Sequence, residues 1–212
     1  TNIHATANRS LVTLDKIPAN VQSAFIAVED NRFYEHNGID PRGIFRAIYS
    51  NLTSGEVAEG GSTITQQLAK NAFLSQDRTF KRKIQEFFIA LRLERQYTKE
   101  EILEMYLNQI YFGRGAYGVQ AAAQTYFGKD VSQLDLSECA MLAGIPRSPN
   151  YYSPLNNLGA ANERKAEVLD QMVKYGYIDS TTAAKTKAES LRLVNPKEQE
   201  NDNTASYFID YV

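Results

Sequence analysis

Residues 98–110 read TKEEILEMYLNQI, and this stretch decides the class of fold. Thr98 is a favoured N-cap residue, and Glu101 follows three positions later, which is the capping-box pattern of a helix N-terminus. The apolar side chains that come next recur at the spacing of one helix face. We therefore expect an α-helix from Thr98 to Ile110.

The segments on both sides of this stretch carry the same kind of pattern. Ser62 stands at the expected N-cap of a helix over residues 63–73, and Pro18 and Pro41 suit the first turns of two earlier helices. No segment alternates convincingly between polar and apolar residues, as a half-buried strand would. The fold class is therefore expected to be mainly α, with further helices over residues 17–28, 41–52 and 78–96 and from Gly115, Ser137, Ala160 and Asp179.

Composition and charge restrict the class of function. The chain has 23 Lys and Arg against 25 Asp and Glu, a net charge of −2, so it lacks the basic footprint of a nucleic-acid binder and we expect no nucleic-acid partner. Cys139 is the only cysteine and sits in an apolar run, which favours a small buried residue. The longest uncharged stretch, residues 115–128, is too short and too polar for a bilayer, which needs about 20 apolar residues. Any membrane anchor is therefore expected outside this chain.

Two acidic residues follow the apolar helix expected over residues 17–28. Glu29 and Asp30 would lie near its C-terminus, where the negative end of the helix dipole disfavours a carboxylate by about 0.3 to 1 kcal/mol. Such a field raises the affinity of an acid for a proton, as a general base working near neutral pH requires. The alternative is a surface ion pair between Glu29 and Arg32. His36 taken alone is more often a structural residue than a catalyst.

A glycine-led helix start follows at residues 59–71, which read EGGSTITQQLAKN. Glycines before a hydroxyl-capped helix leave backbone N–H groups available to anions. Thr63, Gln66, Gln67 and Lys70 share overlapping faces by their three- and four-residue spacing, and such an array of donors and acceptors suits sugars and phosphates. The alternative is an ordinary capped helix with a polar exposed side.

Cations gather just ahead of a second acid, Glu86. A diphosphate leaving group develops negative charge as its bond to a sugar breaks, and fixed cations stabilise that charge in the transition state. The competing interpretation is an i,i+4 surface pair between Arg82 and Glu86, which contributes only a few tenths of a kcal/mol. The cations in question are Lys70, Arg78, Lys81, Arg82 and Lys83.

Residues 41–52 and the C-terminal tail suggest how the domain is organised. Ile44, Phe45, Ile48 and Leu52 lie on one side of the first segment, an amphipathic pattern that fits either a membrane interface or a protein core. The polar, aperiodic tail after Leu193 is typical of a linker.

In this order, the motifs resemble the peptidoglycan glycosyltransferase domain, glycosyltransferase family 51, of class A penicillin-binding proteins and monofunctional transglycosylases. The resemblance spans nearly the whole chain. It rests on Glu29-Asp30-x-x-Phe33-x-x-His36-x-Gly38, Gly61-Ser62-Thr63-Ile64-Thr65-Gln66-Gln67, Arg82-Lys83-x-x-Glu86, residues 101–108, Tyr126-Phe127-Gly128-Lys129 and Leu142-Ala143-Gly144-Ile145-Pro146-x-x-Pro149.

The resemblance implies an architecture and a location. It implies a lysozyme-like helical head within a glycosyltransferase domain over residues 1–193, with a smaller membrane-associated jaw lobe at about residues 39–61. Residues 194–212 would be a linker towards a transpeptidase domain that this chain lacks. The domain would work at the extracytoplasmic face of the bacterial cytoplasmic membrane, anchored by an N-terminal transmembrane helix absent from this chain.

The resemblance also implies a reaction, its partners and residue roles. The family transfers the growing lipid-linked glycan chain to the 4-hydroxyl of lipid II, with inversion and release of undecaprenyl diphosphate. A divalent cation, Mg or Mn, moenomycin as inhibitor and other cell-wall synthesis proteins as partners are implied as well. Glu29 matches the general base and Glu86 the second essential acid. Lys70, Arg78, Arg82 and Lys83 match diphosphate-binding positions, and the substrate cleft matches Asp30, Phe33, His36, Ser62, Thr63, Gln66, Gln67 and Asn71.

Two rival functions remain on the residues alone. A muramidase or lytic transglycosylase would use a glutamate in a helical cleft to cleave glycan strands. Its leaving group is a sugar hydroxyl, so it needs a general acid but no cluster of cations. A catalytically silent domain that binds a membrane surface or a protein partner would not account for two acids beside the array at residues 62–71.

Overall fold

The computed structural model describes residues 10–54, 61–73 and 80–194. Arg78, the residues 55–60 expected in the jaw lobe and the tail at residues 195–212 lie outside the described residues. Short 3₁₀ turns at Leu14–Lys16, Val131–Gln133 and Ile145–Arg147 accompany the α-helices. The helices are α1 (Ala19–Glu29), α2 (Pro41–Ser54), α3 (Ile64–Phe73), α4 (Phe80–Gln96), α5 (Lys99–Gln109), α6 (Val119–Phe127), α7 (Leu136–Gly144), α8 (Leu158–Lys174) and α9 (Ser180–Ala188).

The prediction of a mainly α fold is confirmed. Within the described ranges, extended pairing is limited to one isolated antiparallel bridge between Tyr111 and Tyr117. None of the helices in these ranges is both long and apolar enough to cross a membrane. Cys139 is fully buried in α7, as its apolar surroundings indicated, and burial raises the pKa of its thiol to about 12.

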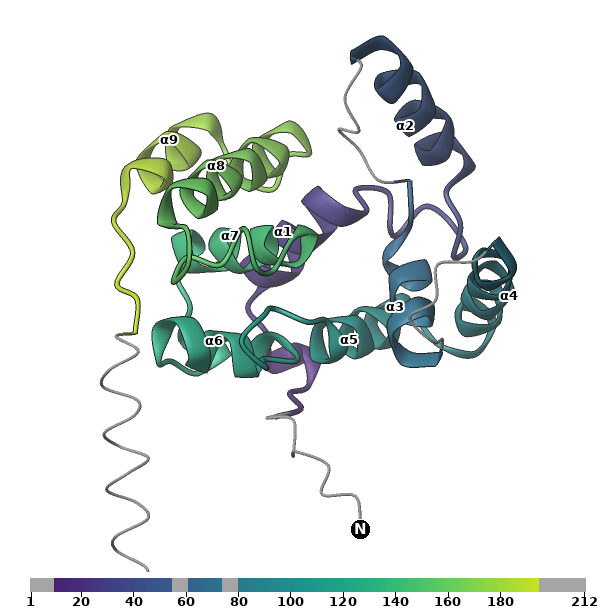
Figure 1. Ribbon diagram of the computed structural model, residues 1–212, viewed down its shortest axis with the longest axis horizontal. Coiled ribbons are helices and arrows are strands. Elements are labelled where there is room, and N and C mark those ends of the chain that lie inside the picture. The colour runs from purple at the N-terminus through teal and green to yellow at the C-terminus, as the bar shows by residue number, and fades with distance from the viewer. Residues whose placement is uncertain (1–9, 55–60, 74–79, 195–212) are drawn as a thin grey trace, which may run out of the picture.

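The helices form two packed groups, and α6 joins them because it packs against both α5 and α7 (Figure 1). Helix α1 packs against α7 and α8, and α3 packs against α4 and α5. Phe25 of α1 also contacts both groups, because its ring forms T-shaped pairs with the rings of Tyr106 on α5 and of Phe112, with centroids 6.2 and 6.0 Å apart. Helix α2 projects away from both groups at the upper right of Figure 1.

The helix starts follow capping chemistry. The capping box of Thr98 and Glu101 is present at the start of α5, as expected. At α3 the N-cap is Thr63, whereas we expected Ser62. The Thr63 hydroxyl accepts from the backbone N–H of Gln66 (3.1 Å), and the Gln66 side chain accepts from that of Thr63 (3.0 Å). Thr63 is preferred because only it has a glutamine three residues later to complete the box.

The helix expected from Gly115 begins four residues later, at Val119. Gly113, Arg114, Gly115 and Gly118 all have positive φ angles, so the preceding residues form a tight turn instead. Gly118 is the N-cap of α6, and a Cβ atom there would lie 2.7 Å from the carbonyl oxygen of Asn108. The close approach of α5 and the turn therefore sets the boundary, which helix periodicity does not reveal.

Candidate active site

Glu29 is the last residue of α1, one position beyond the helix end expected from the sequence, and its side chain is half-buried. Gln67 of α3 donates a hydrogen bond from Nε2 to Glu29 Oε2 over 2.8 Å. The residues that carry this contact are 38 positions apart in sequence. Glu29 is therefore held at the open end of α1 by a side chain from the glycine-led helix.

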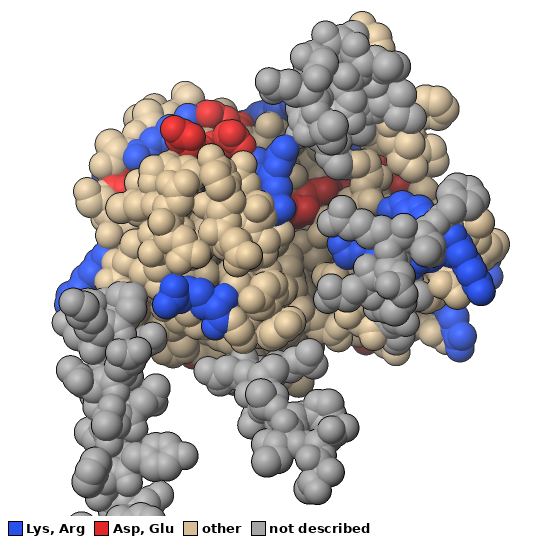
Figure 2. Space-filling view, in the orientation of Figure 1, with Lys and Arg blue, Asp and Glu red and all other residues tan. Residues whose placement is uncertain are grey.

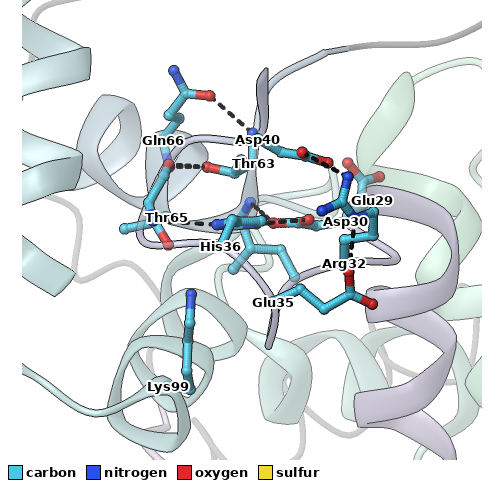
Figure 3. A network of polar contacts seen from close by, with 12 residues as sticks. Glu29, Asp30, Arg32, Glu35, His36, Asp40, Thr63, Thr65, Gln66 and Lys99 are labelled. Atoms are coloured by element: carbon cyan, nitrogen blue, oxygen red, sulfur yellow. Dashed lines mark hydrogen bonds and ion pairs between the residues drawn. The ribbon is translucent and has the colours of Figure 1, made fainter. Parts of the chain in front are cut away.

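Asp30 is buried, and its carboxylate organises the loop that follows α1 (Figure 3). Its two oxygens accept from His36 Nε2 at 3.0 and 2.9 Å, and Oδ2 also accepts from the backbone N–H of Ile64 at 3.0 Å. His36 Nδ1 accepts from the backbone N–H of Gly38, so the ring proton lies on Nε2. Asp30 thereby satisfies one of the unpaired N–H groups at the positive end of α3.

The same loop is fastened to the start of α3 and to α4. The Thr63 hydroxyl donates to the carbonyl of Gly38 over 2.6 Å. Gly38 has a φ of +89°, and a Cβ there would lie 3.0 Å from the carbonyl oxygen of Ala90 on α4. Glycine is required at this position because the loop crosses so close to α4.

Glu86, the second acid, is 2% exposed on α4 and forms an ion pair with Lys83. Lys83 Nζ lies 2.6 Å from Glu86 Oε1 and 2.9 Å from Ser62 Oγ. A buried carboxylate needs such a partner, because desolvation of an unpaired charge is costly. Lys83 thus connects Glu86 to Ser62, two residues before α3 begins.

Both acids consequently reach the first turns of one helix. Gln67 contacts Glu29 from one side of α3, and Lys83 brings Glu86 to Ser62 at its start. A polar cavity of about 30 Å³, large enough for a hydroxyl group, is lined by Glu29 and Ser62 together with Asp40 and Arg46. In Figure 2 acidic atoms lie in the hollow near the centre of the face, and Lys and Arg side chains gather over α4 on its right.

The other predicted site residues divide by burial. Phe33 is fully buried beneath the loop, and Thr63 and Gln66 are buried in the α3 capping box. Lys70 and Asn71 are exposed further along α3, and Arg82 is half-buried on α4. Of the predicted site residues, the hydrogen bonds described above bring Glu29, Asp30, His36, Ser62 and Gln67 together around the start of α3.

Sequence reasoning missed a salt bridge that joins this loop to α2. Arg32 contacts Glu35 Oε2 through Nε at 2.9 Å and Asp40 Oδ1 through Nη1 at 3.2 Å. The alternative considered for Glu29 was a surface ion pair with Arg32, whereas Arg32 pairs with Glu35 and Asp40. Asp40 directly precedes α2, so Arg32 links the loop that contains His36 to the base of the projecting helix. The three-residue spacing of Arg32 and Glu35 could have indicated their contact, but no spacing pattern indicated the contact with Asp40.

A second missed group supports the loop from beneath. Thr65 of α3 donates to Glu94 Oε1 over 2.6 Å, and Lys99 Nζ donates to the same oxygen over 2.8 Å. Lys99 Nζ also lies 4.5 Å from the centre of the Phe33 ring, a cation–π contact. These side chains come from α3, α4 and α5, so no local sequence pattern could have grouped them.

The described residues do not form a metal centre by themselves. No three His, Cys, Asp or Glu side chains in the described ranges are grouped so that they could hold an ion. Glu86 is already paired with Lys83.

The fold and this geometry define a helical domain whose site is built on carboxylates and cations around one helix N-terminus. The chain belongs to the transglycosylase family, whose profile matches residues 1–173. The resemblance drawn from the sequence motifs is thereby confirmed.

Three similar proteins are much longer than this chain. The chain is 50% identical over 207 residues to penicillin-binding protein 1F of Bacillus subtilis, covering 98% of this chain and 29% of that protein. It is 54% identical over 180 residues to penicillin-binding protein 1A of Escherichia coli, with 85% and 21% covered. The crystal structure of penicillin-binding protein 1A from Haemophilus influenzae matches with a TM-score of 0.55 at 28% identity, over 88% of this chain and 18% of that one. The chain thus spans less than a third of the length of these relatives.

Proposed function

We propose that this domain is a peptidoglycan glycosyltransferase that polymerises lipid II. Glu29 removes the proton from the 4-hydroxyl of the acceptor lipid II. That oxygen bonds to the anomeric carbon of the lipid-linked glycan chain while the bond from this carbon to the diphosphate oxygen breaks. The configuration inverts, undecaprenyl diphosphate leaves, and the proton remains on Glu29.

The observation that carries the proposal is the convergence of both acids on the start of α3. Glu29 lines the small polar cavity, where a hydroxyl could sit against its carboxylate. Lys83 Nζ lies between Glu86 and Ser62, where it could contact the diphosphate as negative charge develops. An acceptor side and a donor side are thus available around the start of α3.

The cations favour synthesis over cleavage of the glycan. A muramidase protonates a sugar oxygen and therefore needs a buried acid in its protonated form. Glu86 instead forms an ion pair with Lys83 at 2.6 Å, and Lys83 is a cation of the kind that a diphosphate leaving group needs. Lys70 and Arg82, with Arg78 outside the described residues, complete the proposed diphosphate-binding group. Asp30, His36 and Asn71 are proposed to shape or line the substrate cleft.

Helix α2 is proposed to form the membrane-associated jaw lobe. Phe45 and Tyr49 on this helix are 74% and 71% exposed, although large aromatic side chains favour burial or a membrane interface. The lobe would lie on the outer face of the bacterial cytoplasmic membrane, where its lipid-linked substrates are. We expect the F45S/Y49S variant to bind vesicles of anionic phospholipid at least about fivefold more weakly in flotation assays. The variant lacks two aromatic rings that the membrane would bury. Equal flotation of variant and wild type would contradict a membrane role for α2.

The function can be tested with purified protein and fluorescent lipid II in detergent. We expect a ladder of glycan strands on a gel that collapses to short products when muramidase is added. Moenomycin is expected to block the reaction by occupying the same cleft. The Mg²⁺ or Mn²⁺ requirement implied by the family stays a prediction, which titration with a chelator would test. A folded protein that leaves lipid II unchanged would overturn the proposal.

Lys83→Met is expected to lower the polymerisation kcat by about 10- to 100-fold. The variant removes a charge beside the leaving group and leaves buried Glu86 without this partner. Lys185→Met is the matched control, because Lys185 is exposed on α9 and takes no part in the site. Steady-state rates on lipid II measure the effect, and wild-type turnover by Lys83→Met would remove Lys83 from the proposed role.

A further inference from the structure

A buried tyrosine, Tyr106, contacts the glutamine that donates a hydrogen bond to Glu29. Tyr106 of α5 is 1% exposed, and its hydroxyl donates to Gln67 Oε1 over 3.2 Å. Gln67 in turn donates from Nε2 to Glu29 Oε2 over 2.8 Å. The three side chains come from α5, α3 and α1. The side-chain amide of Gln67 therefore links the hydroxyl of Tyr106 to the carboxylate of Glu29 through two hydrogen bonds.

The chemistry of the groups fixes the direction of this chain. An ionised carboxylate only accepts hydrogen bonds, so Gln67 must present its NH₂ group to Glu29 and its carbonyl oxygen to the opposite side. That oxygen needs a donor, and the hydroxyl of Tyr106 supplies one. Burial raises the pKa of Tyr106 well above its ordinary value, and the nearby charges of Glu29 and Asp30 raise it further. Tyr106 therefore keeps its proton, and its ability to donate, wherever the domain works.

We propose that Tyr106 is a positioning residue that holds the Gln67 amide in the one orientation that can donate to Glu29. The inference rests on the proposed function of Glu29 as the base for the acceptor hydroxyl. Without the hydroxyl of Tyr106, rotation of the amide by half a turn costs less. The rotated amide would place an oxygen against the carboxylate, and Glu29 would lose its anchor. Tyr106 itself touches no substrate in this arrangement.

The direct test is Tyr106→Phe, which removes one oxygen atom and keeps the ring packed against Phe25. We expect kcat for lipid II polymerisation to fall about tenfold, the effect of one lost hydrogen bond, because the base is held in its productive position less of the time. The KM for lipid II is expected to stay within about twofold, since the contacts to the substrate are unchanged. A residue that only stabilised the fold would not produce this separation of kcat from KM.

Tyr126→Phe is the matched control. Tyr126 of α6 is also fully buried, and its hydroxyl donates to the carbonyl of Phe112 over 2.7 Å. This variant loses the same atom and one hydrogen bond, but that bond is not part of the Tyr106–Gln67–Glu29 series. We expect a similar loss of stability in urea and an unchanged kcat.

A second measurement does not depend on turnover. In ¹⁵N-labelled protein, the side-chain NH₂ resonances of Gln67 are expected to be shifted by their bond to Glu29 and to return towards free-amide positions in Tyr106→Phe. They should stay in place in Tyr126→Phe. If Gln67→Met is made, adding Tyr106→Phe to it should lower kcat by less than about twofold more, because the amide through which Tyr106 acts is gone.

The outcomes separate the inference from the proposed function. A wild-type protein that makes no strands overturns the function of Glu29, while the Gln67 resonances still report whether Tyr106 orients the amide. If Tyr106→Phe matches Tyr126→Phe in kcat and leaves the Gln67 resonances unchanged, the inference is wrong. A tenfold loss of kcat at constant KM, together with the shifted resonances, supports it.

Discussion

Glu29→Gln is expected to reduce polymerisation of lipid II by about 10²- to 10⁴-fold, the usual contribution of a general base. The substituted amide keeps the size of the side chain and can still pair with Gln67, but it cannot take a proton from the acceptor hydroxyl. Because Glu29 is half-buried at the end of α1, we expect the free energy of unfolding to change by less than about 1 kcal/mol. Initial rates on fluorescent lipid II and urea denaturation measure the two effects.

The control for this variant is Glu167→Gln on α8. Glu167 is 60% exposed and pairs with Arg164, so the same chemical change occurs far from α3 along the chain. Its turnover is expected to equal that of the wild type. Retention of more than about a tenth of the wild-type rate by Glu29→Gln would exclude Glu29 as the base.

Asp30→Ala is expected to lower the free energy of unfolding by about 2 to 4 kcal/mol and to abolish most activity. Removal of this buried carboxylate leaves His36 Nε2 and the backbone N–H of Ile64 without the acceptor that both now share. The loop after α1 would then lose its fastening to α3, and Glu29 would lose its fixed position beside Gln67. The midpoint of urea denaturation should fall with an unchanged slope, which would show that stability rather than compactness has altered.

Asp170→Ala is the matched control for that loss. Asp170 is 63% exposed on α8 and pairs with Lys187 on α9. Exposed ion pairs contribute little, so we expect a change within about 0.5 kcal/mol. If Asp30→Ala were as stable as Asp170→Ala, the carboxylate would not be the organiser of the loop.

Much of the fold could be predicted because local chemistry governs it. The capping box of Thr98 and Glu101 and the buried Cys139 were both legible in single short stretches. The N-cap expected for α3, Ser62, was one residue too early. The glutamine that completes the capping box lies three positions after Thr63 and identifies Thr63 as the N-cap. The start of α6 could not be predicted in this way, because it depends on how closely Gly118 approaches α5.

The residues of the candidate site could be predicted from the sequence, but the contacts between them could not. Glu29, Gln67 and Glu86 stood out because acids, amides and cations of this kind suit sugar and phosphate chemistry. Nothing local indicated that Gln67 would contact Glu29, or that Lys83 would join Glu86 to Ser62. The Gln67–Glu29 and Lys83–Ser62 contacts join residues 38 and 21 positions apart, so they exist only once α1, α3 and α4 have packed. The Lys83–Glu86 pair is local, because the two residues are three positions apart on α4.

The central claim is that this site builds glycan strands and does not cleave them. The most direct measurement offers the purified protein lipid II and preformed, differently labelled glycan strands in one reaction, and follows both labels together with released undecaprenyl diphosphate. We expect that lipid II is consumed, that one undecaprenyl diphosphate appears for each bond formed, and that the preformed strands are not shortened. Shortening of those strands, with lipid II left intact, would overturn the proposed polymerase function and identify a lytic enzyme.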